Sequence, residues 1–499
     1  MDELIALRDT TLGQMPTGVK VPRYARKSLS AGIVHIGLGN FHRAHQAWYL
    51  HRLMDMGLAH DWAIVGAGVR PADAQQRERL KAQDCLTTLI ELDPSGKSAE
   101  IIGSMIDFVP VEADNAALVE RMARPDIRIV SLTVTEGGYY IDPATGGFDA
   151  GHPDIVHDSA NPQSPRTAFG AMIAALKQRR DAGTGPFTAL SCDNLQGNGA
   201  ILRLAVVTLA SLSDPELASW IDKNCTFPNS MVDCIVPATG PHEMALARGF
   251  GIDDAAPVTH ENFRQWVIED NFCAGRPGWD KVGATLSHHV HAYEAMKLRI
   301  LNGGHQIVSI PGDLLGIETI SAAMGDAGIR GFFKQTMIHE VAPNVQPVQG
   351  MTPTAYLELI DRRFANAEIV DTTRRVAFDG SSRQSGFIVP SIRDALANGH
   401  PVDGLALMSA LWMRYCLGVR EDGSPIAPND PSAGELKIVA ERALNNPSQW
   451  ISQEKYYGNV GNNTRFASAF DRWVNVLNDR GVRAALGQIN EAVEAPAAT

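Results

Sequence analysis

The chain has 499 residues, which predicts two domains, and its 44% hydrophobic and 20% charged residues are those of a globular protein. Its formal net charge of −12 argues against a nucleic-acid partner, because such partners are bound by basic surfaces. The start lacks a signal-peptide pattern, the longest apolar run is too short for a bilayer, and the six cysteines have no regular spacing, so we expect a cytoplasmic protein without membrane contact.

The first half of the chain alternates short β-branched segments with helical ones, which is typical of a parallel sheet built from βαβ units. The predicted strands are residues 32–36, 62–66, 127–134, 187–192 and 231–236, and the helices between them include residues 43–56 and 166–179. From about Ala292 onward helical periodicity dominates, as in residues 354–364 and 403–417. We predict an α/β fold with a Rossmann-like N-terminal domain, residues 1–287, and a mainly α-helical C-terminal domain, residues 288–499.

A glycine-rich turn, GLGNFHRAH from Gly37 onward, follows the first predicted strand. Gly37 and Gly39 permit a tight turn and a close approach of the backbone to a pyrophosphate, which the next helix N-terminus also attracts. His42 stands where the dinucleotide-binding fingerprint has its third glycine, and an ordinary strand-to-helix turn is the alternative. Past the second strand, Asp73 favours NAD through the ribose hydroxyls whereas Arg70 favours a 2′-phosphate, so this signal is mixed.

A second cluster lies in YEAMKLRILNGGHQIVS, residues 293–309. On an α-helix Lys297, Asn302 and His305 would share one side, and the two glycines before His305 would let a ligand approach closely. Alcohol oxidation needs a base for the hydroxyl proton and donors for the developing carbonyl oxygen, and a buried lysine can be that base without a metal. The alternative is a solvated lysine, a capping asparagine and a core histidine.

Ordered motifs along most of the chain carry a resemblance to a known family. They are GIVHIGLGNFHRAHQAWY, VSLTVTEGGYY, SCDNLQGNG, FPNSMVDCIVP, QWVIEDNFCAGRP, KLRILNGGH and FDGSSR. Through them the chain resembles the polyol-specific long-chain dehydrogenases. The resemblance implies a monomer that uses NAD, with NADP as a weaker alternative, and no zinc. It implies reversible oxidation of a sugar alcohol, with D-mannitol to D-fructose as the first expectation.

The resemblance also implies roles for single residues. Lys297 matches the catalytic lysine, and Asn302 and His305 match the residues that bind the substrate oxygen. The positions that match substrate-binding residues are Asn194, Asp233, Arg375 and Arg383, and Glu136 matches a gate for proton exchange with solvent. The positions expected to bind the cofactor are Gly37, Gly39, Asn40, Phe41, His42, Arg43 and Asp73.

Three positions depart from the family pattern. Cys234 replaces an arginine beside the substrate aspartate, Gly386 replaces a lysine in the segment after DGS, and Ala72 replaces the second acid of a pair used against NADP. These changes concern the choice of sugar and cofactor and leave the reaction class intact.

Other activities remain as alternatives. They are a hexuronate reductase acting on fructuronate or mannonate, a D-arabinitol or sorbitol dehydrogenase, and a nucleotide-binding sensor, which would not need the Lys297 set. A uronate substrate would need an additional cation to bind its carboxylate. Cys234 and Gly386 stand where the family has an arginine and a lysine, which argues against a hexuronate reductase. His288, His289 and His291 lack an HExxH or CxxC context, so we expect no metal site.

Overall fold

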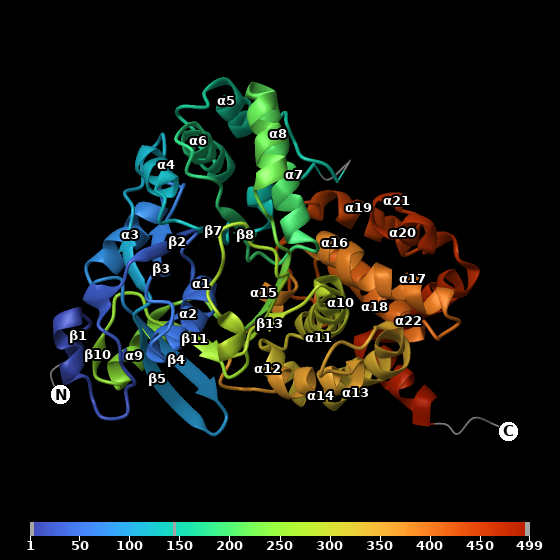
Figure 1. Cartoon of the computed structure of the whole chain (residues 1–499). Coiled ribbons are helices and arrows are strands. Elements are labelled where there is room, and N and C mark those ends of the chain that lie inside the picture. The colour runs from blue at the N-terminus through green and yellow to red at the C-terminus, as the bar shows by residue number, and fades with distance from the viewer. Residues whose placement is uncertain (1–3, 143–145, 495–499) are drawn as a thin grey trace. The chain divides into compact units, whose positions relative to one another are not determined.

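The computed structural model describes residues 4–142 and 146–494, and the chain divides into two compact units (Figure 1). Unit 1 is Met1–His291 and unit 2 is Ala292–Thr499, so the division falls within helix α10 (Val290–Met296). No helix within the described ranges combines the length and hydropathy that crossing a membrane requires.

A five-stranded parallel sheet lies in unit 1 with the order β6-β3-β2-β7-β8 (Figure 1). The strands are β2 (Ala31–Ile36), β3 (Ala63–Ala67), β6 (Met105–Phe108), β7 (Ile129–Leu132) and β8 (Thr188–Ser191). The strand order reverses between β2 and β7, and ligands of open α/β sheets bind outside the carboxyl ends of the strands at such a point. The predicted Rossmann-type fold of the N-terminal half is confirmed.

Helices cover both faces of this sheet, which is why its strands are almost continuously apolar. Val34 and Leu132 pack on one face with helices α4 (Ala116–Ala123), α6 (Ala168–Asp181) and α7 (Asn198–Ser213). Ile33 and Ile129 point to the other face, toward α1 (Asn40–Ala44) and α2 (Gln46–Asp55). The remaining helices of unit 1 are α3 (Asp73–Lys81), α5 (Pro153–Ala160), α8 (Pro215–Asn224) and α9 (Pro241–Gly249).

Three smaller sheets complete unit 1, and the sequence analysis missed most of their strands. They pair β11 (Val258–Glu261), β4 (Thr87–Asp93) and β5 (Gly96–Ile102); β13 (Thr285–Leu286), β12 (Gln265–Ile268) and β9 (Ser230–Asp233); and β1 (Ile5–Ala6) with β10 (Ile252–Asp253). The strand predicted at residues 231–236 is β9, and it lies outside the parallel sheet. Trp279 packs in the core of unit 1.

Every named element of unit 2 is helical, so the predicted helical domain is confirmed. Its α-helices are α11 (Gly303–Leu314), α12 (Ile320–Gly325), α13 (Ala327–Thr336), α14 (Pro353–Phe364), α15 (Thr373–Val376), α16 (Gly380–Arg383), α17 (Val389–Ala397), α18 (Asp403–Cys416), α19 (Ala433–Ala443), α20 (Ser448–Ile451), α21 (Glu454–Tyr457) and α22 (Thr464–Glu494). Three π-helical segments interrupt them, η5 (Lys297–Asn302), η6 (Met337–Val341) and η8 (Gln384–Ile388).

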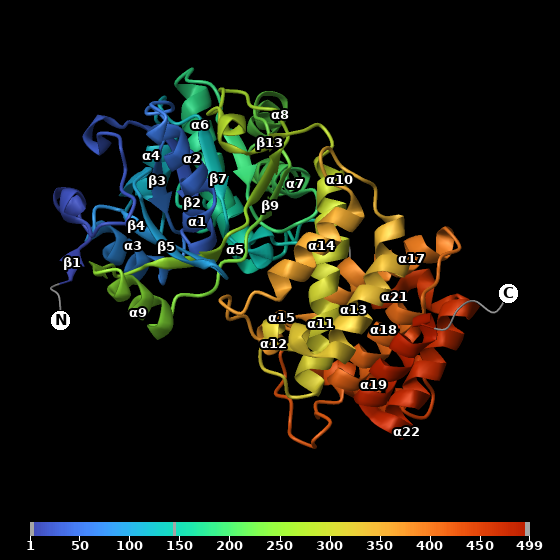
Figure 2. The same ribbon diagram turned by 90° about the horizontal axis from the view of Figure 1, so that it is seen from below.

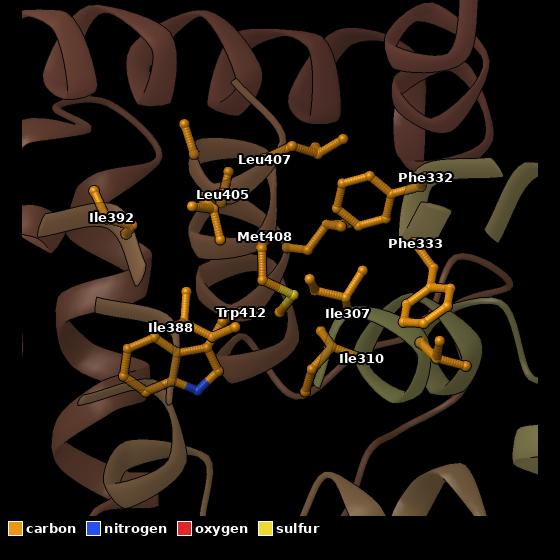
Figure 3. Close-up of a cluster of buried hydrophobic side chains, with 14 of the residues drawn as sticks. Ile307, Ile310, Phe332, Phe333, Ile388, Ile392, Leu405, Leu407, Met408 and Trp412 are labelled. Carbon is orange, nitrogen blue, oxygen red and sulfur yellow. The ribbon is translucent and has the colours of Figure 1, made fainter. Parts of the chain in front are cut away.

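Helix α18 lies at the centre of unit 2 and packs against α11, α13 and α22 (Figure 2). Figure 3 shows its Leu405, Met408 and Trp412 beside Ile307 and Ile310 of α11, and all are buried. The apolar face of α11 is therefore fixed in the core. Because this packing fixes the orientation of the helix, it also fixes the positions of the polar residues of α11.

Candidate active site

The glycine turn begins where β2 ends, next to the end of β7. Gly37 has a φ of 92°, and a Cβ there would lie 2.1 Å from the backbone oxygen of Thr133. The Thr133 hydroxyl donates to the Gly37 carbonyl at 2.6 Å, which ties the two strand ends together. A side chain at Gly39 would meet no atom of the described residues within 4 Å. Gly37 is thus required by the fold, whereas Gly39 leaves open space that a ligand can use.

The helix after the turn rests on a pair of histidines. His42 stacks on His35 of β2 with ring centroids 3.4 Å apart, and both are buried. Burial, together with the neighbouring cations, holds the pKa of His42 well below its usual value. Neither ring nitrogen of His42 has a hydrogen-bond partner in the part of the chain that the structure describes. His42, which stands where the fingerprint has its third glycine, therefore packs α1 onto strand β2.

Arg43 and Asn40 hold the turn to the rest of unit 1. The buried Arg43 guanidinium donates to the carbonyl of Ala256 and, at 2.7 Å, to the Asn40 side-chain oxygen. Asn40 Nδ2 donates at 2.9 Å to the carbonyl of Pro237. Phe41 is half-buried and is the other side chain predicted to contact a cofactor here. His42 and Arg43 would therefore contribute to cofactor binding by supporting the turn.

Asp73 begins helix α3, beyond the end of β3, where the acid of a dinucleotide site is expected. Its carboxylate accepts from the backbone N–H of Arg70 at 3.0 Å and from the Arg70 guanidinium at 3.4 Å. The side chain of Arg70 is 71% exposed and that of Asp73 is 17% exposed. Because the Arg70 side chain is exposed, it can turn away while the backbone contact holds Asp73.

The remaining predicted residues of unit 1 follow strand ends. Glu136 is exposed on the short helix η3 (Glu136–Tyr139) after β7, and Asn194 is exposed after β8. Asp233 is the last residue of β9 and is buried. Cys234, which follows it, is buried and brings no cation to this position.

The sequence analysis missed two residues that hold these strand ends. Asp193 is buried and accepts from the backbone N–H groups of Val134 and Thr135. Asn198 donates to the carbonyls of Asp193 at 3.0 Å and Ser230 at 2.8 Å. Both residues lie in the motif SCDNLQGNG, which could have pointed to them, although a buried carboxylate or amide has no spacing pattern of its own.

In unit 2, Lys297 and Asn302 are the ends of the π-helix η5, and Lys297 is 8% exposed. Residues five apart are hydrogen-bonded neighbours along a π-helix, so the two side chains lie one turn apart. The Asn302 Oδ1 atom is buried without a hydrogen-bond partner among the described residues. An unpartnered Oδ1 is a hydrogen-bond acceptor that a donor of a ligand could satisfy, and the amide N–H groups of Asn302 can donate.

His305 lies one turn further, in α11, and its ring stacks on Phe364 at 4.1 Å between centroids. A Cβ at Gly304 would lie 2.8 Å from Phe333 and 3.4 Å from Phe364, whereas Gly303 would make only ordinary contacts of 3.6 Å or more. The interpretation that the glycine pair admits a ligand is wrong for Gly304. Its missing side chain makes room for the aromatic rings on which His305 rests.

Arg375 and Arg383 lie in the segment around DGS. Arg375 is exposed and paired with Asp371, with Nε 2.6 Å from Oδ1. Arg383 donates to the carbonyl of Val376 at 3.0 Å, and that oxygen also accepts from Gln306 of α11 at 3.0 Å. The shared acceptor joins this segment to the helix of His305, a link without a sequence signal.

No group of three or more histidine, cysteine, aspartate or glutamate side chains that could hold a metal ion occurs in the described ranges. His288, His289 and His291 are exposed, and the first two precede α10 in a loop. The exposed surface of these histidines fits the interpretation of polar residues between the two predicted domains.

Comparisons with known proteins match both units. The Mannitol dehydrogenase Rossmann domain matches residues 31–281, and the Mannitol dehydrogenase C-terminal domain matches residues 289–477. The mannitol 2-dehydrogenase of Cereibacter sphaeroides is 56% identical over 472 residues, which cover 95% of this chain and 99% of the relative. That of Phaeosphaeria nodorum is 38% identical over 489 residues, covering 97% of this chain and 85% of the relative.

Two solved structures are similar along almost the whole chain. One is the ternary complex of Pseudomonas fluorescens mannitol 2-dehydrogenase with NAD and D-mannitol, with a TM-score of 0.89 and 41% identity over 98% of this chain and 100% of that one. The other is a D-sorbitol dehydrogenase in substrate-free form, with a TM-score of 0.88 and 34% identity over 97% of this chain and 100% of that one.

Proposed function

The chain belongs to the mannitol dehydrogenase family and is an NAD-dependent polyol dehydrogenase, and we propose that it oxidises D-mannitol reversibly to D-fructose. The observation that carries this choice of substrate is the 56% identity to a mannitol 2-dehydrogenase along nearly the full length of both chains. NAD, when bound, would supply the acceptor for the hydride of the carbinol carbon.

In this proposal Lys297 is the general base. Its Nζ takes the hydroxyl proton during oxidation and returns it to the carbonyl oxygen during reduction. A lysine amine shielded from water, as at Lys297, is the base that this chemistry needs in place of a metal-bound hydroxide. Asn302 and His305 donate hydrogen bonds to the substrate oxygen as it becomes a carbonyl.

The cofactor is held by residues of unit 1. Gly39 leaves room for the pyrophosphate, Gly37 shapes the turn, and Asn40 and Phe41 begin the helix whose N-terminus faces it. His42 and Arg43 support this helix from within unit 1. Asp73 accepts the ribose hydroxyls.

Substrate recognition is assigned to polar residues of both units. Asn194 and Asp233 would bind sugar hydroxyls from unit 1, and Arg375 and Arg383 would do so from unit 2. Glu136 is exposed on η3 and would pass the released proton to solvent.

A sorbitol dehydrogenase is the second candidate, because the D-sorbitol dehydrogenase structure matches with nearly the same TM-score. A hexuronate reductase is disfavoured by the neutral Cys234 and Gly386, since a carboxylate substrate calls for added cations.

The deciding experiment measures kcat/KM for mannitol, sorbitol and arabinitol with NAD, and for fructose and fructuronate with NADH. We expect mannitol and fructose to have the highest values, and a higher value for any other pair would replace them. Dialysis against a strong chelator should leave the rate unchanged. Restoration of a lost rate by zinc would overturn the lysine-based mechanism.

We further propose that the enzyme acts as a monomer in the cytoplasm. Light scattering after size-exclusion chromatography should give the mass of one chain, 53.9 kDa. A mass of two chains or more at micromolar concentration would contradict this.

A further inference from the structure

The segment after β7 contains a strained residue. Thr135 has φ 68° and ψ 165°, a conformation that is essentially restricted to glycine. Such a strained residue persists only where its surroundings impose it. It immediately precedes Glu136.

Asp193 supplies that constraint from the end of β8. Its Oδ1 accepts from the backbone N–H of Thr135 at 2.9 Å, and its Oδ2 accepts from Val134 N–H at 3.0 Å and from the Tyr139 hydroxyl at 2.7 Å. Asp193 and Tyr139 are buried, so these bonds are shielded from water. The Asp193 carboxylate thus binds Val134 and Thr135 before Glu136 and Tyr139 after it, so the segment is held on both sides of Glu136.

Asp193 and the segment after β7 are also bonded to neighbours of other predicted site residues. Asn198 holds the Asp193 carbonyl at 3.0 Å, which fixes the peptide that leads to Asn194. On the other side, Thr133 donates to the Gly37 carbonyl at 2.6 Å. The segment 133–139 is therefore fixed between the glycine turn and the end of β8.

We propose that Asp193 is a positioning residue for polyol oxidation: its carboxylate imposes the strained backbone of Thr135 and so sets the place of Glu136, and its carbonyl, held by Asn198, sets that of Asn194. This inference rests on the proposed function for the roles of Glu136 and Asn194. Asp193 itself acts through them and does not touch the substrate.

The charge of Asp193 supports this role. Burial raises its pKa to about 6, the hydrogen bonds from Tyr139, Val134 and Thr135 oppose that rise, and the charge of Glu136 adds to it. Burial and, after it, the charge of Asp193 raise the pKa of the neighbouring Cys192 thiol. A carboxylate kept ionised in such a place costs stability, which is typical of functional positions.

The test compares Asp193→Asn, Thr135→Gly and the double variant. Asp193→Asn replaces an acceptor by an NH2 group that faces backbone N–H donors, so kcat for polyol oxidation should fall about 10- to 100-fold, as displaced catalytic groups do. The dissociation constant of NADH should change less than roughly threefold, because the glycine turn keeps its own bonds. Glycine adopts the Thr135 conformation freely, so the double variant should regain at least about fivefold in kcat.

The matched control is Asp158→Asn. Asp158 is also buried in unit 1 and accepts from the N–H groups of Arg166 and Thr167 and from the Thr167 hydroxyl, at 2.7–3.0 Å. It should lose stability and keep kcat. Equal kcat in both Asp→Asn variants, or no rescue by Thr135→Gly, would overturn the proposal.

Two further measurements keep the test decisive. If Asp193→Asn does not fold, Tyr139→Phe removes one donor and should lower kcat about threefold or more, and an unchanged kcat would overturn the proposal. Hydrogen exchange of residues 134–139 in the full chain should be faster in Asp193→Asn than in wild type. That readout tests the positioning even if the wild type proves inactive on polyols, an outcome that would count against the proposed function alone.

Discussion

Lys297 and Asn302 are the first and last residues of a single π-helical segment. On an α-helix their directions would differ by about 140°, the full width of the side predicted for the set, and the wider i→i+5 turn reduces this difference. π-Helical turns are rare and are frequently found at functional sites. The π-helical backbone therefore supports the proposal that Lys297 and Asn302 act together at one site.

Replacing Lys297 by alanine should lower kcat for mannitol oxidation by about 10²–10⁴-fold, the usual contribution of a general base. The dissociation constant of NADH should stay nearly unchanged, since Lys297 lies in unit 2, outside the cofactor-binding fold. Steady-state kinetics and fluorescence titration give the two values. Lys334→Ala, at a half-exposed lysine of the same unit, is the control and should keep kcat. Near-normal turnover of Lys297→Ala would remove it from the mechanism.

The two glycines of the turn should respond differently to alanine. Gly39→Ala should keep its melting temperature but raise the Kd of NADH about tenfold or more, because a methyl group would occupy the space left for the pyrophosphate. Gly37→Ala should lose about 1–3 kcal/mol or more of stability, because of its positive φ and the contact with Thr133. Thermal unfolding and NADH titration distinguish the two outcomes, and normal NADH binding by Gly39→Ala would exclude that glycine from the cofactor site.

The glycine pair before His305 gives a similar contrast. Gly304→Ala should lower the free energy of unfolding by about 1–3 kcal/mol, because its Cβ would press on Phe333 in a packed core. Gly303→Ala should be neutral or raise it by up to about 1 kcal/mol through better helix propensity. Urea unfolding followed by circular dichroism measures both. Equal effects would mean that the packing around Phe333 does not explain why residue 304 is glycine.

The sequence analysis predicted four of the five strands of the parallel sheet, the glycine turn and the helical second half, because each has a periodic or turn signal, and it missed the edge strand β6. β2, β3, β7 and β8 differ from the predicted ranges by a few residues at most. The strands β4, β5 and β11 were missed although β11 and most of β4 are buried, because threonine, charged and histidine residues interrupt their apolar pattern.

Fewer details of the candidate site could be predicted from the sequence. The sequence places Lys297 near Asn302 but cannot give the π-helical turn, which depends on how η5 packs against η8. Asp193 and Asn198 act through backbone groups of Thr135 and Ser230, which no residue pattern encodes. The glycine at 304 has a cause, Phe333, that lies far away in sequence.

Buried histidines should make stability depend on pH. Burial lowers the pKa of His35 to about 3, so below its ordinary value of 6.5 the unfolded chain binds a proton that the folded chain does not. Stability from this group is complete above pH 6.5 and falls by up to about 1.4 kcal/mol per pH unit as pH decreases toward 3. Asp193 and Glu340 have the opposite effect on stability as pH decreases. Burial raises their pKa values to about 6 and about 7, so the folded chain binds protons that the unfolded chain does not.

The contribution of His35 is isolated by comparing wild type with His35→Gln. Urea unfolding at pH 7.5, 6.5 and 5.5 should show a weaker loss of stability toward acid in the variant, since the opposing carboxyls are common to both. His288→Gln, at an exposed histidine, serves as the control and should follow the wild type. Parallel curves for wild type and His35→Gln would show that His35 is protonated alike in both states.

The choice between NAD and NADP should depend on Asp73 and Arg70. The Asp73 carboxylate would repel a 2′-phosphate and accept the ribose hydroxyls, so wild type should prefer NAD. Because Ala72 offers no second acid and Arg70 is exposed, some activity with NADP is expected, with Arg70 pairing the phosphate. Asp73→Ala should lower the ratio of kcat/KM for NAD to that for NADP by about tenfold or more, the loss of one charge-assisted contact. Arg70→Ala should raise the ratio, and the same ratio in wild type and Asp73→Ala, or a wild type that prefers NADP, would show that Asp73 does not contact the ribose.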